Sequence, residues 1–131
     1  MSSTPSASVE NVAVETLSRL FVELAEDERF TAGLRESGIS LLWEHSRPEL
    51  RIFVSADGAV VGEDAPQYAT HIIKSSTGTA HELWLGRTTF PAEITSGRLR
   101  IFGKVAKVLE LMPILAPAFG RYPEIVARGN S

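Results

Sequence analysis

Histidine is the residue type of this sequence best suited to acid–base or metal chemistry, and the chain has three: His45, His71 and His81. Because there is no cysteine, thiolate nucleophiles, disulfides and cysteine-ligated zinc or iron–sulfur centres are excluded. His81 precedes Glu82 but has no second histidine four residues later, the spacing that puts two ligands on one helix face. We therefore predict no catalytic residue, no metal and no cofactor, with the histidines on solvated faces. A metal site made of two histidines is the weaker alternative.

Two other kinds of reaction motif are missing from the sequence. It contains no Gly-x-Ser-x-Gly elbow for a serine nucleophile and no glycine-rich loop of the types that hold phosphates. With 13 basic and 16 acidic residues the net charge is −3, which argues against a nucleic-acid-binding protein. The sequence has no apolar run of about 18 residues, so it does not predict a membrane span. We predict a cytoplasmic protein of 131 residues with one domain, residues 9–131, after a disordered tail, residues 1–8.

The elements that would position any site follow two patterns, one helical and one strand-like. Residues 9–25 and 27–37 repeat apolar side chains at helical spacing, and Gly38 is placed to end the second helix. Strand-like runs follow at residues 39–45, 49–55, 59–61, 67–74 and 98–102. Asp57-Gly58, between the second and third runs, predicts a hairpin turn. The short links between the first four runs predict an antiparallel meander.

The C-terminal third is rich in apolar residues that do not form one regular helix. Residues 77–90 are ambiguous, with a short helix capped by Thr79 as one interpretation, and residues 90–97 are expected to be a connection. Helical spacing returns at 104–111, but residues 112–126 contain three prolines and a glycine and cannot be one uninterrupted helix. Because such a segment neither packs regularly nor suits water, we expect it to act as a lid.

The order of these elements, together with the string Ser96-Gly-Arg-Leu-Arg-Ile-Phe-Gly-Lys104 and the leucine-rich helix after it, resembles the sterol carrier protein type 2 family. The resemblance covers roughly residues 12–115. The family often has an acidic residue directly after the second glycine, where this chain has Lys104. This departure leaves the expected fold unchanged but makes the identity of the ligand less transferable.

The resemblance implies an α+β fold in which helices cover a five-stranded, mostly antiparallel sheet, with an apolar tunnel between sheet and helices. It also implies binding and intracellular transfer of a fatty acid, acyl-CoA, phospholipid or sterol without chemistry, and a transient contact with membranes. Peroxisomal members of the family end in a Ser-Lys-Leu-like signal, whereas this sequence ends in Arg-Gly-Asn-Ser. A cytoplasmic lipid carrier is therefore the expected function.

The side chains expected to contact the ligand are apolar and come from both the sheet and the helices: Phe21, Leu24, Ile52, Val54, Ile72, Trp84, Ile101, Leu109, Met112, Leu115 and Phe119. An error of one residue in a strand's register would move its side chains to the other face. Two alternatives use the same pocket. One is an enzyme of secondary metabolism with His71, His81 or Glu82 in acid–base roles, and the other is an accessory protein that presents a hydrophobic intermediate to partner enzymes.

Overall fold

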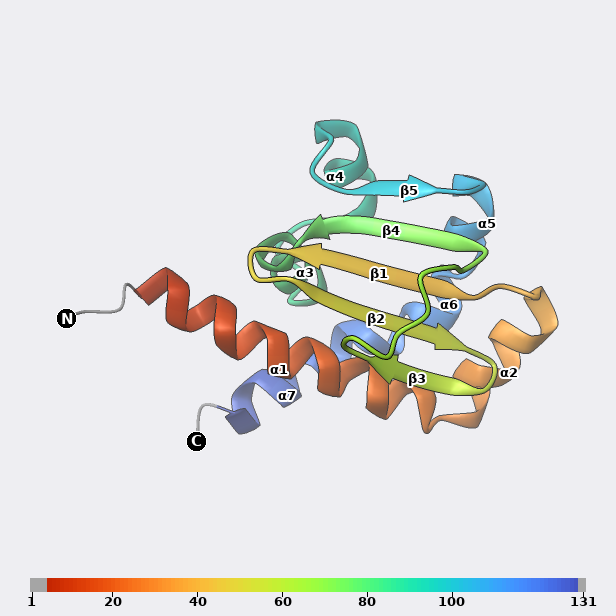
Figure 1. Cartoon of the computed structure of the whole chain (residues 1–131), viewed down its shortest axis with the longest axis horizontal. Helices are drawn as coiled ribbons and strands as arrows, with labels where there is room; N and C mark the ends of the chain where they lie inside the picture. Colours follow the sequence, from red (N-terminus) through yellow and green to blue (C-terminus); the bar gives the residue numbers. More distant parts are fainter. Residues whose placement is uncertain (1–4, 130–131) are drawn as a thin grey trace.

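The computed structural model describes residues 5–129, with only the backbone described for residues 5–11 and 129. One five-stranded sheet is covered on one face by helices (Figure 1). The strands are β1 (Leu41–Ser46), β2 (Leu50–Ser55), β3 (Gly58–Val61), β4 (His71–Ser76) and β5 (Arg100–Phe102). The helices are α1 (Pro5–Ala25), α2 (Glu28–Ser37), α3 (Thr77–Trp84), α4 (Phe90–Ser96), α5 (Val105–Glu110), α6 (Met112–Leu115) and α7 (Pro117–Gly129). Within the described range, no helix combines the length and the apolar character that crossing a membrane requires.

The first two helices form where the sequence predicts them, with one difference at the start of α1. The side chain of Asp27 accepts a hydrogen bond from the backbone N–H of Arg29 and begins α2, and Gly38 ends it with a φ of 69°. Helix α1 begins at Pro5, and proline is a residue that the first turn of a helix tolerates. The expected tail is therefore corrected for residues 5–8, while residues 1–4 lie outside the described range.

Two further helices occupy the segment between β4 and β5. The hydroxyl of Ser76, rather than that of Thr79, caps α3 by accepting from the backbone N–H of Thr79 at 3.0 Å. The expected connection at residues 90–97 is instead helix α4, capped by Thr89, with Pro91 in its first turn. Proline at that position fits the start of a helix.

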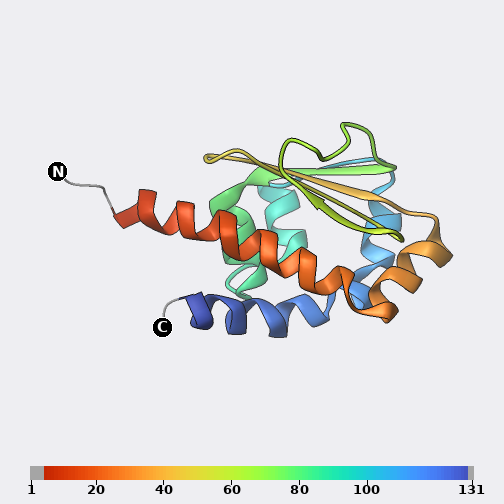
Figure 2. The same cartoon turned by 60° about the horizontal axis from the view of Figure 1, so that its bottom comes forward.

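The sheet has the strand order β3-β2-β1-β4-β5 and is mixed, with three antiparallel pairs and one parallel pair. The predicted meander is wrong at β4, which lies parallel to β1 instead of pairing with β3. Residues 62–70 make this possible because they cross the face of the sheet that the helices leave open (Figure 2). Ala65 and Ala69 of this crossing pack on Leu42 and form a second, small apolar cluster.

Proline divides the C-terminal third into separate helices, as the sequence predicts. Helices α6 and α7 each begin close to a proline, and a further proline, Pro123, lies inside α7. Helix α7 runs beside α1 (Figure 2), where Arg121 and Arg128 form ion pairs with Glu23 at 3.1 and 3.2 Å. The C-terminal helix is thus fixed to the N-terminal one, and both lie beneath the sheet.

Candidate ligand-binding interior

Alternate residues of the central strands point into the space between the sheet and the helices. Trp43 of β1 lies between Ile52 of β2 and Ile73 of β4, and all three side chains are buried. The same face continues through Leu41 and its cross-strand partner Val54. This face packs against α1, α2 and α3, with α7 packed on α1 and α3, so the region between the two layers is almost wholly apolar.

An aromatic cluster occupies the middle of this interior, with Trp84 of α3 at its centre. The ring centroid of Trp84 lies 5.8 Å from that of Trp43, 6.0 Å from Phe21, 5.7 Å from Phe90 and 5.0 Å from Phe119. These rings come from β1, α1, α4 and α7, which meet only in the folded protein. Aromatic pairs in tilted or edge-to-face arrangements contribute about 0.5–1.5 kcal/mol each beyond the area they bury.

Most side chains expected to contact a ligand meet in this interior. Those fully buried there are Phe21, Leu24, Ile52, Val54, Trp84 and Leu115. Those half-buried and packed against it are Ile101, Met112 and Phe119. Contact between these side chains and a ligand remains a prediction.

The expected positions of Ile72 and Leu109 are corrected by the structure. Ile72 pairs with Leu42 on the opposite face of the sheet, because alternation along β4 turns Ile73 inward instead. Leu109 is 39% exposed on α5, where Val108 takes the inward position. The register of β4 and the rotation of α5 depend on packing partners that are distant in sequence.

Helices α5 and α6 close one end of the interior. Val108 of α5, Leu115 of α6 and Leu111 between the two helices are buried, and a Cβ atom at Gly33 of α2 would collide with Ile114 of α6. Helix α5 packs chiefly on α6, whereas α6 also contacts α2 and α7. The short segment 105–115 therefore covers apolar side chains with few supports of its own. It overlaps the predicted lid, residues 112–126, only at 112–115, because the rest of that range is mostly helix α7, which ion pairs hold against α1. That the segment 105–115 acts as a lid stays a prediction.

A group of three polar side chains, two buried and one half-buried, attaches α7 to α1 and α3. The hydroxyl of Tyr122 lies 2.8 Å from that of Thr16 and 2.7 Å from Nδ1 of His81. Burial raises the pKa of Tyr122 to about 12 and lowers the pKa of His81. Because both side chains are neutral near pH 7 and satisfy one another, their arrangement supports a structural role for His81.

The other two histidines are buried, which corrects the expectation that they would lie on solvated faces. Nδ1 of His45 lies 3.3 Å from the hydroxyl of Ser75, and Nδ1 of His71 lies 3.0 Å from the hydroxyl of Thr70. Burial lowers the pKa of His45 to about 4. Across the described residues, no three histidine, aspartate or glutamate side chains are grouped so that they could hold a metal ion.

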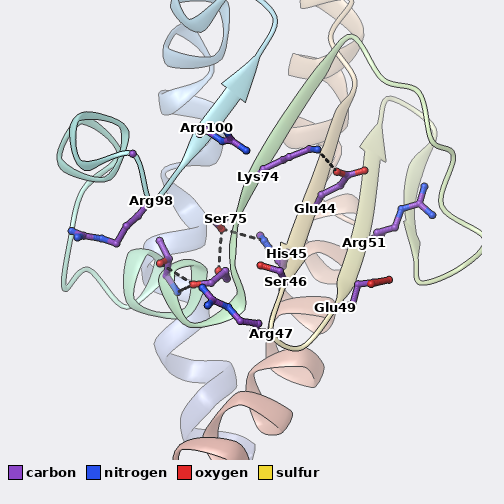
Figure 3. A pocket seen from close by; sticks show the side chains of 13 residues that line it. Glu44, His45, Ser46, Arg47, Glu49, Arg51, Lys74, Ser75, Arg98 and Arg100 are labelled. Carbon is purple, nitrogen blue, oxygen red and sulfur yellow. Dashed lines mark hydrogen bonds and ion pairs between the residues drawn. The ribbon is translucent and has the colours of Figure 1, made fainter.

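A hollow of about 750 Å³ opens on the outer face of the sheet, beside the β1–β2 hairpin (Figure 3). Nearly all of its lining residues are polar or charged, and basic residues outnumber acidic ones: Glu44, His45, Ser46, Arg47, Glu49, Arg51, Lys74, Ser75, Ser76, Thr79, Gly97, Arg98 and Arg100. This hollow could not be predicted from the sequence, because its lining comes from segments that are far apart in the chain. No motif links them.

Several of the basic groups in this hollow already have partners. Nζ of Lys74 lies 3.4 Å from Glu44, and Arg98 forms an ion pair with Glu93 at 2.7 Å. Arg51 donates to the backbone carbonyls of residues 65 and 66, each at 3.0 Å. An anion placed there would compete with these interactions, so the hollow is a weaker candidate site than the interior.

Comparison with known proteins identifies the architecture. No protein-family model matches the sequence, and no curated protein matches it significantly. Among solved structures, sterol carrier protein domain 2 of Helicoverpa armigera is similar, with a TM-score of 0.67 and 16% identity, over 92% of this chain and 95% of that one. Sterol carrier protein 2 of Yarrowia lipolytica has a TM-score of 0.63 and 13% identity, over 78% and 88%. A structure described as "UbiJ-SCP2 Ubiquinone synthesis protein" has a TM-score of 0.53 and 17% identity, over 84% and 95%.

These similarities define an α+β domain with a helix-covered sheet. More particularly, the chain has the fold of sterol carrier protein 2. The resemblance found in the sequence is thereby confirmed at the level of the fold.

Proposed function

We propose that this protein binds a lipid-like ligand in the interior between the sheet and the helices and transfers it within the cytoplasm without chemistry. The observation that supports this function best is the short lid, 105–115, over an apolar interior in a sterol carrier protein 2 fold. Each ligand methylene removed from water contributes about 0.8 kcal/mol, so ten carbons supply about 8 kcal/mol before association costs. A ligand therefore needs little more than apolar side chains and a segment that can move aside.

Binding is tested first with the unmodified protein, stripped of bound lipid. Titration with a fluorescent fatty acid, a fluorescent sterol and an isoprenoid is expected to give saturable binding for at least one class. Native mass spectrometry of the protein as purified would identify any hydrophobic molecule that it retains. Flat titrations with all three classes would show that the proposed function is wrong.

Replacing Leu115 with tryptophan is expected to weaken ligand binding about tenfold or more, because the larger ring would fill space beneath the lid. Leu109→Trp is the matched control, since Leu109 is exposed on the outer side of the same lid. Thermal unfolding separates the effects, because overpacking a filled core costs about 1–3 kcal/mol of stability. If L115W lowers stability but leaves affinity unchanged, the ligand does not lie beneath this lid.

The transfer step is assigned to the exposed face around α5. Phe102, Val105 and Leu109 are exposed apolar side chains there, and Lys104 and Lys107 are exposed beside them. Apolar and basic groups together suit the surface of an anionic membrane. The double variant Val105→Ser, Leu109→Ser is expected to keep ligand affinity but to slow transfer of a fluorescent lipid between anionic vesicles severalfold.

An accessory role in biosynthesis is the second candidate function. It is favoured by the same exposed apolar face, which could meet an enzyme instead of a membrane, and by the similarity to a structure described as a ubiquinone synthesis protein. If the double variant transfers lipid between vesicles as fast as the unmodified protein, this candidate replaces membrane transfer.

A further inference from the structure

The interior contains two hydrogen-bond donors that have no acceptor. The indole nitrogens of Trp43 and Trp84 are fully buried and make no hydrogen bond within the described part of the chain. Buried tryptophan N–H groups usually find a partner, and an unsatisfied buried donor costs about 1–3 kcal/mol. Two such donors on neighbouring rings therefore need an explanation.

Both donors belong to the part of the interior where a ligand is expected. Trp43 projects from β1 and Trp84 from the end of α3, and the ring of Phe21 from α1 packs against both, at 5.0 and 6.0 Å. The buried hydroxyl of Tyr122 is already engaged by Thr16 and His81. The two donors thus lie within the apolar core, and the hydroxyl of Tyr122 is engaged with other groups.

The charge of the interior limits the kind of acceptor that would fit. Among the described residues, the buried polar side chains include no lysine and no arginine. His45, whose ring lies 6.4 Å from that of Trp43, is neutral near pH 7 because burial lowers its pKa to about 4. An ionised carboxylate in this space would lack a positive partner, and burying an unpaired charge is far more costly than burying a neutral oxygen.

Building on the proposed function, we propose that the ligand carries a neutral oxygen acceptor, such as the carbonyl of a ketone, ester or amide, which accepts hydrogen bonds from the indole N–H groups of Trp43 and Trp84. The apolar remainder of the ligand packs among the surrounding rings. The ligand class is therefore an oxygenated, uncharged hydrophobic molecule. Pure hydrocarbons leave the donors unsatisfied, and ionised fatty acids introduce an unpaired charge.

The test uses the two indole N–H signals of the ¹⁵N-labelled, unmodified protein, one for each of its two tryptophans. Dodecane, 2-dodecanone and dodecanoate are supplied from cyclodextrin and have the same number of carbons. We expect 2-dodecanone to move at least one indole proton signal downfield and to bind about tenfold more tightly than dodecane, a difference of ~1.4 kcal/mol. Dodecanoate is expected to bind more weakly than the ketone at pH 7.

Variants assign the effect to the indole nitrogens. Trp43→Phe and Trp84→Phe keep an aromatic ring but remove the donor, and at least one of them is expected to abolish most of the preference for the ketone. Phe21→Leu is the control, because it alters the packing around both indoles without removing either N–H group. Its preference for the ketone is expected to persist.

The outcomes separate this inference from the function on which it rests. If dodecane and 2-dodecanone bind equally and neither indole signal responds, the inference is overturned while lipid binding stands. Indole protons shifted upfield in the free protein and unmoved by the ketone would show that the N–H groups face aromatic rings, which also overturns it. Tighter binding of dodecanoate than of 2-dodecanone would show that the ligand is not uncharged, which overturns the inference. If no compound binds, the proposed function is wrong as well.

Discussion

Acidification from about pH 7 to pH 5 is expected to lower the free energy of unfolding by about 2 kcal/mol through His45 alone, and by about 3 kcal/mol at pH 4. Burial lowers the pKa of His45 from 6.5 to about 4, although a hydrogen bond with the backbone of Ser75 raises the pKa in part. Between these values the unfolded chain binds a proton that the folded protein does not. The stabilisation is therefore complete above about pH 6.5 and is lost as the pH falls toward 4.

Urea unfolding at pH 7, 6 and 5 measures this effect, with His45→Gln as the matched control. Glutamine keeps a polar side chain of similar length but does not titrate, so the variant is expected to lose clearly less stability over the same range. Glu93 does not obscure the result, because hydrogen bonds from Arg98 and Thr88 hold the pKa of its carboxyl below the ordinary value. Equal losses in both proteins would mean that His45 is not the acid-sensitive group.

Replacing Gly103 with alanine is expected to cost about 2–5 kcal/mol, from two separate causes. Gly103 joins β5 to α5 with a φ of 115°, a backbone conformation that residues with a side chain rarely adopt. A Cβ atom there would also lie 2.6 Å from Cδ2 of His71 and 3.1 Å from the backbone carbonyl oxygen of Thr70. Urea unfolding at pH 7 measures the total cost.

Gly58→Ala separates the two causes. Gly58 has a comparable φ of 128°, but a Cβ atom there would have no other atom within 4 Å. Its substitution is expected to cost about 1–3 kcal/mol from the backbone conformation alone. Equal costs for the two variants would show that the close approach of His71 to Gly103 does not contribute to stability.

Sequence predicts this fold best where the signals are local. Helix α2 has Asp27 at its start and Gly38 at its end, so both boundaries follow from neighbouring residues. Gly103 likewise marks the change from strand to helix, because its backbone conformation is one that glycine adopts readily. The string containing Gly103 also led to the correct fold.

Sequence fails where pairing is decided between distant segments. The crossing at residues 62–70 contains too few residues for a helix, so it suggested a hairpin, yet it carries β4 across the sheet to lie beside β1. That choice depends on the apolar contact of Leu42 with Ala65 and Ala69, which cannot be read from one segment. The same limitation put Ile72 on the wrong face.

The candidate site shows the same division. Apolar residue type and helical spacing were enough to place Phe21 and Trp84 in the interior. The unsatisfied indole nitrogens could not be foreseen, because satisfaction depends on every neighbour in the folded protein. The outer hollow was missed for a related reason, since Arg47 and Arg100 come together only when β1 and β5 join one sheet.

The shortness of the outermost strands has a consequence for the proposed function, in which helices move aside to admit a ligand. β3 has four residues and β5 only three, and these two strands form the rims of the sheet. Rims this short offer few free backbone groups onto which a second polypeptide could add a strand. If the proposed function holds, displacement of the lid would therefore uncover apolar side chains without also exposing a long strand edge onto which another chain could add.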